Sequence, residues 1–347
     1  MAQRSEGANG TPEVGRMGGG KSILRDVAQG AGVSLRTASR VLNDDPRVAE
    51  TTRTRVREVM RDLSYTPDLM ARSLRAGTDA TIGLVVESIA DPFFSELVAA
   101  VESATSDDGK SVLVASHHGD ADLERRIVGQ MLERRVSGLL IVATGGDHSW
   151  LNTATAPLVL VDRPADGLEA DVVGIDDGQA AFDAVTHLIA HGHRDIAYVG
   201  DYPHVATSAA RLTGYREAMT RNGLSVPDDL VRASCPTAQE ARVAMGTLLA
   251  GERPLTAVLS AATRCSLGVV PALHEQRRTD VALVGFGDFA MADMLVPAIT
   301  VVDHSAVAVG LAAAARLTRR IAEPDLTPES IHVPVHLIER GSGEQRA

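Results

Sequence analysis

The segment GRMGGGKS, residues 15–22, matches the phosphate-loop pattern G-x-x-x-x-G-K-[ST] at every position. In that pattern, backbone N–H groups and the lysine bind the phosphates of a nucleotide, and the hydroxyl binds Mg²⁺. The loop holds its shape only between a buried strand and a helix. The residues before it here, SEGANGTPEV, are polar and turn-forming, so they predict no strand. We therefore expect no nucleotide site, and we interpret residues 1–20 as a disordered tail, whether translation starts at Met1 or at Met17.

Three histidines and two cysteines are the other residues whose types suggest chemistry. His187 and His191 are four residues apart, which would place both on one helix face, and His193 follows two residues later. No carboxylate or cysteine motif completes a metal site around them. Cys235 and Cys265 form no C-x-x-C motif, so we expect packing residues in a reducing compartment. A G-x-S-x-G nucleophile turn is absent as well. Because none of these motifs is complete, we expect no metal, no cofactor and no enzymatic activity.

Length and charge limit the class of protein. The 347 residues are 44% hydrophobic and 23% charged, enough for two or three modules with their own cores. Residues 1–78 hold 13 Lys and Arg against 9 Asp and Glu, whereas the remainder holds 21 against 36. A basic first module on an acidic body suggests that only the first module contacts nucleic acid. Because no apolar run is long enough for a membrane span or a secretory signal, we expect a cytoplasmic protein without a membrane partner.

The segment SILRDVAQGAGVSLRTASRVLND predicts two short helices joined by a turn at Gly32. Apolar residues at helical spacing form the expected inner faces, and Ser34 can cap the second helix. A third helix is predicted from the same spacing further on. The inner-face residues are Leu24, Val27, Ala28 and Ala31, then Ala38, Val41 and Leu42, then Val56, Val59, Met60 and Leu63. Three short helices in about 45 residues with a glycine turn are typical of a helix-turn-helix module, expected over residues 21–66.

The second predicted helix would enter the major groove of DNA by its N-terminal end. Arg36 and Arg40 can each donate two hydrogen bonds to a guanine, and Leu35 can contact a thymine methyl group. Other side chains of the second and third helices and of the turn before them suit phosphates, which position a protein without specifying sequence. These are Ser34, Thr37, Ser39, Arg53 and Arg55. The alternative interpretation is a solvated face on a small helical bundle, and the pattern by itself does not decide between the two.

Longer stretches of the chain resemble the lactose-repressor (LacI/GalR) family of transcription regulators. The resemblance starts with ILRDVAQGAGVSLRTASRVLND, YTPDLMARSLRAG and TIGLVVESIADPFFSEL. It continues through ERRVSGLLIVA, LVLVDRP, HLIAHGHRDIAYVG, RLTGYREAM and VALVGFGD, so that about residues 22–340 follow the family in order. It implies a sequence-specific DNA-binding regulator, expected to be a repressor. Such a protein binds a pseudo-palindromic operator as a homodimer and responds to a small-molecule effector.

The segment PDLMARSLRAG, residues 67–77, predicts a helix too short to be stable alone in water. The resemblance implies a hinge over residues 67–80 that folds on operator DNA and pairs with its twin in the minor groove. Leu74 matches the leucine that the family inserts between base pairs, which kinks the duplex. Arg72 would lie near phosphates. The alternative is an ordinary linker.

From residue 81 onward, strand-like runs alternate with helix-like segments, which is typical of an α/β protein with parallel sheets. The predicted strands are TIGLVV, SVLVAS, GLLIVA, PLVLV, DIAYVG, TAVLS and VALVGF. About 260 residues are many for one such sheet, so we expect two lobes. The resemblance implies doubly wound sheets like those of periplasmic binding proteins. The expected effector-binding and dimerisation domain spans residues 81–347, with lobe 1 at about 81–175 and 303–325 and lobe 2 at about 176–302 and 326–340.

A ligand of this fold would bind between the lobes, at the carboxyl ends of the strands. Arg211 matches the ligand-binding arginine of the family, and Asp162 ends a predicted strand at the cleft. Phe93 and Phe94 follow the first strand, where the family stacks rings on its ligand. We add Arg264 and Asp288 to the predicted effector site.

The expected pocket departs from the family at two motifs. Where the family often reads AND and GFDD, this chain reads AAT at 261–263 and GFGD at 285–288. Sugar hydroxyls need several convergent partners, so a simple sugar is less expected than in other members. Arg211, with Arg264, would suit an anionic or less polar ligand, and a regulator without any effector stays open. A transport-type binding protein would need an export signal and no helix-turn-helix, and this chain shows the opposite.

Overall fold

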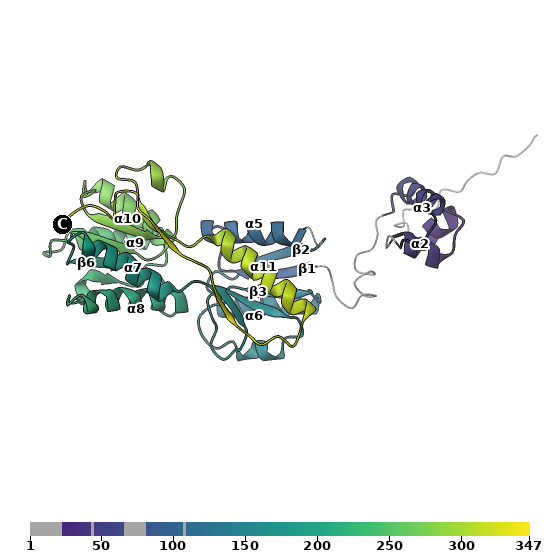
Figure 1. The fold of residues 1–347 in the computed structure, drawn as a ribbon, viewed down its shortest axis with the longest axis horizontal. Helices are drawn as coiled ribbons and strands as arrows, with labels where there is room; N and C mark the ends of the chain where they lie inside the picture. The colour runs from purple at the N-terminus through teal and green to yellow at the C-terminus, as the bar shows by residue number, and fades with distance from the viewer. Residues whose placement is uncertain (1–22, 43–44, 66–80, 107–108) are drawn as a thin grey trace, which may run out of the picture. The chain divides into compact units, whose positions relative to one another are not determined.

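The computed structural model describes residues 23–42, 45–65, 81–106 and 109–347 (Figure 1). The chain divides into two compact units, Met1–Ala76 and Gly77–Ala347. The GRMGGGKS segment and the predicted hinge residues Arg72 and Leu74 lie outside the described residues.

The described residues of the N-terminal unit form three helices around a small apolar core. They are α1 (Leu24–Gly30), α2 (Leu35–Leu42) and α3 (Glu50–Asp62). Val27, Ala31, Val41 and Val56 are buried at their centre, which confirms the helical spacing read from the sequence. Gly32, with a φ of +63°, forms the turn between α1 and α2, a conformation that glycine adopts without strain. Leu63 departs from the prediction, because it follows the last turn of α3 and is 38% exposed.

The C-terminal unit contains two sheets, each the centre of one lobe. The first sheet has the order β11-β5-β4-β3-β1-β2 and is parallel throughout. Its strands are β1 (Thr81–Val86), β2 (Ser111–Ser116), β3 (Gly138–Ile141), β4 (Leu158–Asp162), β5 (Asp171–Gly174) and β11 (Ser330–His332). The second sheet has the order β12-β10-β9-β8-β6-β7, and only β12 is antiparallel to its neighbour. Its strands are β6 (Ile196–Val199), β7 (Val231–Arg232), β8 (Ala257–Ser260), β9 (Ala282–Phe286), β10 (Thr300–Asp303) and β12 (His336–Ile338).

Helices cover both faces of each sheet (Figure 1). On the first sheet, α5 (Pro92–Ser106) and α11 (Ala306–Ala322) pack against one face and α6 (Ala121–Glu133) against the other. On the second sheet, α7 (Asp177–Ala190) and α8 (Ala206–Arg221) cover one face, and α9 (Ala238–Leu249) and α10 (Thr263–Glu275) the other. Strand side chains alternate accordingly: Ile82, Leu84 and Val86 point to α5 and α11, and Val85 points to α6. The expected α/β class with two parallel-sheet lobes is confirmed.

The C-terminal segment crosses between the lobes differently from the expectation. The sequence predicts residues 326–340 in the second lobe, but β11 pairs with β5 in the first sheet, with Ser330 opposite Val172. The chain joins β12 to the second sheet only after this strand. Within residues 109–347 it passes from one lobe to the other after β5, after β10 and after β11. These three crossings connect the two lobes.

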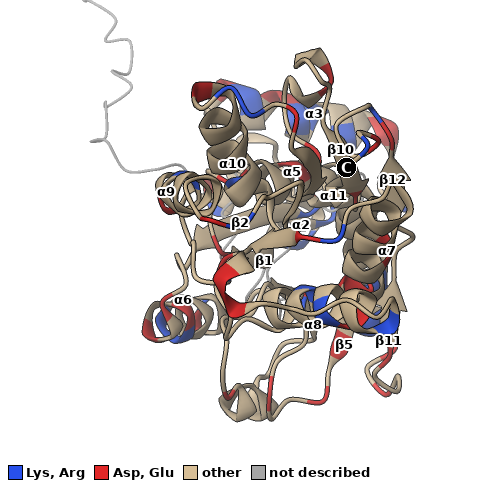
Figure 2. Cartoon of the chain, turned by 90° about the vertical axis from the view of Figure 1, so that its left-hand side faces the viewer, with Lys and Arg blue, Asp and Glu red and all other residues tan. Residues whose placement is uncertain are grey.

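Acidic and basic residues are interspersed along the helices and loops of the C-terminal unit (Figure 2). The helix α6 carries Asp122 and Glu133 beside Arg125 and Arg126. The exposed face of α8 likewise carries both signs. These two helices therefore offer no one-sided charge to a nucleic acid.

The contact between α7 and α8 depends on Gly214. A Cβ atom at this position would lie 2.0 Å from the carbonyl oxygen of Gly178. We expect Gly214→Ala to force the two helices apart and to lower the free energy of unfolding by about 1–3 kcal/mol. The matched control is Gly129→Ala in α6, where a Cβ would have no neighbour within 4 Å. That variant should gain about 0.5–1 kcal/mol from helix propensity.

Urea unfolding, followed by far-ultraviolet circular dichroism, measures both glycine variants. Loss of stability in both would show that α6 is as tightly packed as α8. A neutral Gly214→Ala variant would show that α7 and α8 can separate at little cost.

Candidate functional site

The N-terminal end of α2 presents the residues expected to read DNA. The Ser34 hydroxyl accepts a hydrogen bond from the backbone N–H of Thr37 at 3.1 Å and lies 2.9 Å from the Thr37 hydroxyl. It therefore caps α2, as the sequence predicts. Leu35 and Arg36 are exposed, with Leu35 at 43%. The cap thus fixes the helix start, and the next two side chains face solvent.

Arg40, one turn further along α2, lies beside an acidic residue. Its Nε is 3.7 Å from a carboxylate oxygen of Asp45, and its side chain is 41% exposed. Hydrogen bonds from Arg47 to the same carboxylate hold the pKa of Asp45 below its usual value. Because the Asp45 carboxylate is already hydrogen-bonded to Arg47, its ion pair with Arg40 is weak, and the Arg40 side chain can leave it to contact DNA.

Arg53 does not occupy the exposed position expected of a phosphate contact. Its side chain is 11% exposed, and its Nε lies 3.3 Å from Glu50. A terminal nitrogen donates to the backbone carbonyl of Asp45 at 2.9 Å and of Val48 at 3.4 Å. Arg53 is therefore a buried side chain that connects α3 to the loop after α2 through hydrogen bonds. Ser39 is half-buried on α2.

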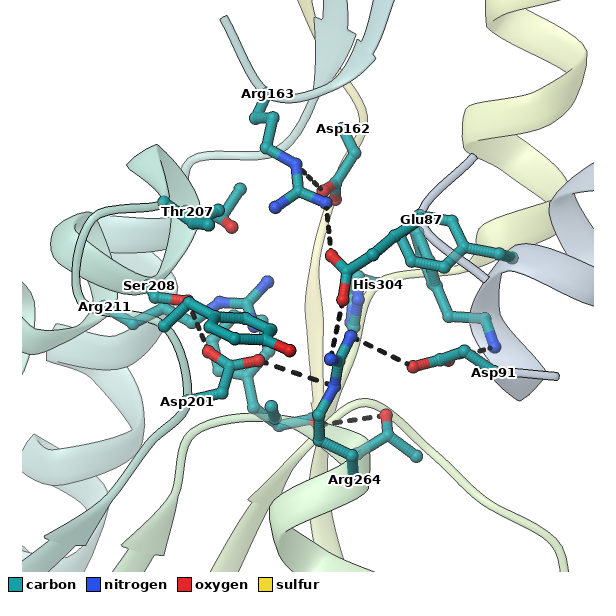
Figure 3. Close-up of a pocket in the computed structure, with 17 residues that line it drawn as sticks. Glu87, Asp91, Asp162, Arg163, Asp201, Thr207, Ser208, Arg211, Arg264 and His304 are labelled. Carbon is teal, nitrogen blue, oxygen red and sulfur yellow. Dashed lines mark hydrogen bonds and ion pairs between the residues drawn. The ribbon is translucent and has the colours of Figure 1, made fainter. Parts of the chain in front are cut away.

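A cleft lies between the two lobes at the carboxyl ends of the strands (Figure 3). Side chains at or after the carboxyl ends of β1, β4, β6, β8, β9 and β10 line it. The structure brings five of the six predicted effector residues together there: Phe93, Phe94, Asp162, Arg211 and Arg264.

Asp288 is the exception among the predicted effector residues, because it does not line the cleft. Its carboxylate accepts hydrogen bonds from Arg340, at 2.8 Å for Oδ1 and 2.5 Å for Oδ2, and is 37% exposed. This ion pair holds the pKa of Asp288 below its usual value. The neighbouring Gly287 has a φ of +83°, and a Cβ there would lie 2.2 Å from the Thr263 hydroxyl. A carboxylate at 287, as in other family sequences, would therefore require this region to rearrange.

Arg264 joins the two lobes through three carboxylates, which we call the acidic cage: Glu87, Asp91 and Asp201 (Figure 3). From the first lobe, Glu87 Oε1 lies 2.6 Å and Asp91 Oδ2 3.4 Å from its terminal nitrogens. From the second lobe, Asp201 Oδ2 lies 3.5 Å from its Nε. Burial and these charges act in opposite directions, and the carboxylates prevail, so the pKa of Arg264 rises above its usual value.

Arg211 lies deeper in the second lobe. Its Nε donates to Asp177 at 2.7 Å, and Nη1 donates to the backbone carbonyl of Ala261 at 2.9 Å. Its guanidinium also covers the ring of Phe286, 3.9 Å from the centroid. Burial raises the pKa of Asp177 to about 6, even though the charge of Arg211 acts against the rise. Asp177 and Arg211 thus form a buried ion pair that holds the Arg211 side chain in place at the cleft.

Asp162 and Arg163 follow β4 at the first-lobe wall. Asp162 has a φ of 71°, a left-handed conformation that aspartate tolerates better than most residues. Arg163 donates to Glu87 at 3.0 Å and lies 3.2 Å from Asp162. Burial raises the pKa of Asp162 above its usual value. Burial also acts on Glu87, but the charges of Arg163 and Arg264 outweigh it and hold the pKa of Glu87 below its usual value.

Aromatic rings form the apolar part of the cleft. Phe93 stacks on His304, with centroids 4.7 Å apart, and Phe286 lies 5.2 Å from the same ring. Burial, together with the charge of Arg211, lowers the pKa of His304 to about 3. The imidazole is therefore neutral near pH 7, and it serves as a flat surface with a polar edge.

The part of the cleft around Arg264 is nearly filled by its own side chains. Its free cavity measures about 50 Å³, room for a few water molecules and far less than a typical ligand pocket. Four carboxylates and three guanidinium groups line it. The sequence analysis treats Arg211 and Arg264 as charges available to an anionic ligand, but both are already paired with carboxylates. The excess of acidic groups disfavours an anion here.

Several residues of this site are not evident from the sequence pattern. Glu87, Asp91 and Asp201 were not singled out, nor were Arg163 and His304. Four of them follow the end of a predicted strand within a few residues. Listing the polar residues after each predicted strand would have found them, because those strand ends meet at one edge of a parallel sheet.

The histidines that resemble a metal site have other partners. The His187 Nε2 lies 2.8 Å from Glu344, His191 Nδ1 lies 2.9 Å from the carbonyl of His187, and His193 Nε2 lies 3.0 Å from the carbonyl of Gln345. In the described parts of the chain, no group of three or more His, Cys, Asp or Glu side chains is arranged to hold a metal ion. No helix there combines the length and apolar composition needed to cross a bilayer.

Comparison with known proteins matches both units. Residues 23–68 match the profile of bacterial regulatory proteins of the lacI family, and residues 185–343 match the periplasmic binding protein-like domain. The chain is 32% identical over 318 residues to the HTH-type transcriptional regulator GalR of Salmonella typhimurium, covering 90% of this chain and 93% of that protein. The chain belongs to the lacI family of bacterial regulatory proteins. As a lacI-family member, it is a DNA-binding transcriptional regulator.

Other members of the lacI family agree with this assignment. The ribose operon repressor of Escherichia coli is 31% identical, covering 92% of this chain and 99% of that protein. The lac repressor dimer, solved with operator and the anti-inducer ONPF, superposes with a TM-score of 0.83 at 26% identity. It covers 93% of this chain and 99% of that one. The family profile begins at residue 23, directly after the GRMGGGKS segment.

Proposed function

We propose that this lacI-family regulator is a cytoplasmic repressor that binds a pseudo-palindromic operator as a homodimer, and that a small molecule in the interlobe cleft sets its affinity for DNA. The N-terminal end of α2 supports operator reading. Arg36 is exposed there, and a guanidinium can donate two hydrogen bonds to one guanine. Ser34 caps the helix, so the side chain is presented from a fixed backbone.

The geometry of the cleft supports control by a ligand. Arg264 links the lobes by ion pairs to Glu87 and Asp91 on one side and Asp201 on the other. A molecule that breaks or replaces these contacts changes the relative stability of the open and closed lobes. A coupling of about 1–3 kcal/mol would change operator affinity by roughly 5- to 150-fold.

Exposed apolar side chains on the C-terminal unit support self-association. Val307 and Leu311 are each 46% exposed on α11, and Leu267 is 44% exposed on α10. Met294 and Val296, in the segment after β9, are 76% and 82% exposed. Large apolar residues this exposed are typical of surfaces that a second copy covers.

A second candidate is a regulator of the same fold without a small-molecule effector. The free cavity of about 50 Å³ favours it, because the cleft satisfies its own charges without a ligand. We favour the regulator with an effector, because Arg264 forms ion pairs with both lobes. A ligand can take over these ion pairs and so change how the lobes are held together.

Fluorescence anisotropy of the full chain tests the proposal. The labelled DNA is the intergenic segment upstream of its own gene, and scrambled DNA of equal length is the control. We expect a preference for the upstream DNA of roughly 1,000-fold or more, with affinity for both falling as salt rises. Light scattering of the same sample should give the mass of two chains. Equally weak binding to both DNAs, or a monomer at the binding concentration, would contradict the proposal.

A further inference from the structure

A ligand of useful size that binds around Arg264 must displace a side chain there, because the free cavity in this part of the cleft is only about 50 Å³. A second space of about 410 Å³ between the lobes borders it at Asp162 and Thr207. Among the charged side chains that line it, Arg264 is the most exposed, at 21%. The others range from 5% for Arg163 to 14% for Asp91. Arg264 is therefore the side chain that can leave with the smallest loss of buried contacts.

Displacing Arg264 changes the charge balance of the cleft. The four lining carboxylates would then face only Arg163 and Arg211, and the nearest partner of Arg211 is a fifth carboxylate, Asp177. Removing one member of a buried ion pair is strongly unfavourable, because it strands the remaining charge away from water. A neutral or anionic ligand would leave the carboxylates of the acidic cage without a positively charged partner. A ligand that brings a cation would replace the ion pairs lost with Arg264.

Two further groups in the cleft are ready to bind a ligand. The Nδ1 atom of His304 is buried and has no hydrogen-bond partner among the described residues, and the side chain is 7% exposed. In a neutral imidazole one ring nitrogen accepts a hydrogen bond, which an N–H group of a ligand can donate. The ring of Tyr202, with its centroid 5.7 Å from the Arg264 guanidinium carbon, offers a face to a cation. Both observations are independent of the carboxylates.

We propose that the acidic cage of Glu87, Asp91 and Asp201 is a cation-binding subsite, and that the effector carries a guanidinium or ammonium group that takes the place of Arg264. This inference rests on the proposed function, because it assumes that the cleft is the effector site. It assigns the ligand to a chemical class: a small molecule with a positively charged nitrogen, flanked by polar or ring parts that contact Phe93 and His304.

The first test uses the full-length Arg264→Ala variant with methylguanidinium as the probe. Methylurea, which has nearly the same shape but no charge, is the matched control. For a dissociation constant near 1 mM, about 10 mM methylguanidinium should raise the Tm of the variant by roughly 3 °C. The wild type should respond less, because its own guanidinium occupies the cage. Adding Glu87→Gln to the variant should remove most of the response.

Equal shifts with methylguanidinium and methylurea in Arg264→Ala would overturn the proposal. A shift that Glu87→Gln leaves unchanged would do the same, since the probe would then bind elsewhere. Should Arg264→Ala fail to fold, Arg264→Lys keeps a charge in the cage and should show a smaller shift with the same preference for methylguanidinium. No preference in that variant would also overturn the proposal.

The second test uses the wild-type protein on its operator. A metabolite extract is divided on a cation exchanger at pH 7, and each fraction is added to the protein–DNA complex. We expect the retained fraction, which holds the cationic molecules, to change operator affinity by at least 5-fold. Activity in the flow-through alone, or in neither fraction, would overturn the proposal. Operator binding measured in the same samples separates this failure from failure of the proposed DNA-binding function.

Discussion

Replacing Arg36 by alanine is expected to weaken operator binding by about 5- to 150-fold, equivalent to about 1–3 kcal/mol. The side chain is exposed at the N-terminal end of α2, and its removal leaves the buried core of the N-terminal unit intact. Because two hydrogen bonds to a guanine depend on the base, the loss should concentrate at one base pair of each half-site. Anisotropy titrations against operators with single base changes measure this selectivity.

The control for Arg36 is Arg216→Ala on α8, an exposed arginine of the C-terminal unit. It should leave operator affinity unchanged within experimental error. If Arg36→Ala instead weakens binding equally to operator and to scrambled DNA, Arg36 contacts phosphate and reads no base. In that case Arg40 or Leu35 would be the side chain that contacts the bases.

Replacing Arg211 by methionine is expected to lower the free energy of unfolding of the C-terminal unit by about 3–5 kcal/mol. The substitution strands the buried carboxylate of Asp177 and the carbonyl of Ala261, which now accept from Arg211 at 2.7 and 2.9 Å. Adding Asp177→Asn should recover much of the loss, because the stranded charge is then removed as well. Urea unfolding measured by the fluorescence of Trp150, the single tryptophan, reports on this unit.

The matched control is Arg221→Met in the same helix. Its ion pair with Glu217 has nearly the same length, 2.7 Å, but the two side chains are 65% and 50% exposed. It should cost less than about 1 kcal/mol, as exposed pairs do. Similar losses in Arg211→Met and Arg221→Met would show that burial of the Asp177–Arg211 pair does not determine its effect.

Several residues show how far sequence reasoning extends. The helix-turn-helix and the alternation of strands and helices follow from apolar spacing within one segment, and the structure places both where the spacing predicts. Arg53 shows the limit. Its charge and its place near α2 suggested a phosphate contact, but its side chain bonds the carbonyl groups of Asp45 and Val48. Whether an arginine points outward depends on the loop that folds over it, and a periodic pattern carries no such information.

The strand β11 shows a second limit. Nothing in residues 330–332 indicates which sheet they join, because a short strand pairs with whichever edge the preceding chain brings near. The helix α11 packs on the first lobe, so the segment that follows it begins near β5, at the edge of the first sheet. The lobe assignment therefore depended on packing between distant segments.

The sequence by itself determined the family, the order of most helices and strands, and five of the residues that line the cleft. Caps, turns and apolar periods act over a few residues, so a linear pattern reveals them. Only the tertiary structure decided the partners of the charged groups. Arg264 and Glu87 lie 177 positions apart, and Arg211 and Asp177 lie 34 apart. Ion pairs depend on distance in space and on burial, so the folded lobes were needed to show that the cleft holds an acidic cage around its own arginine.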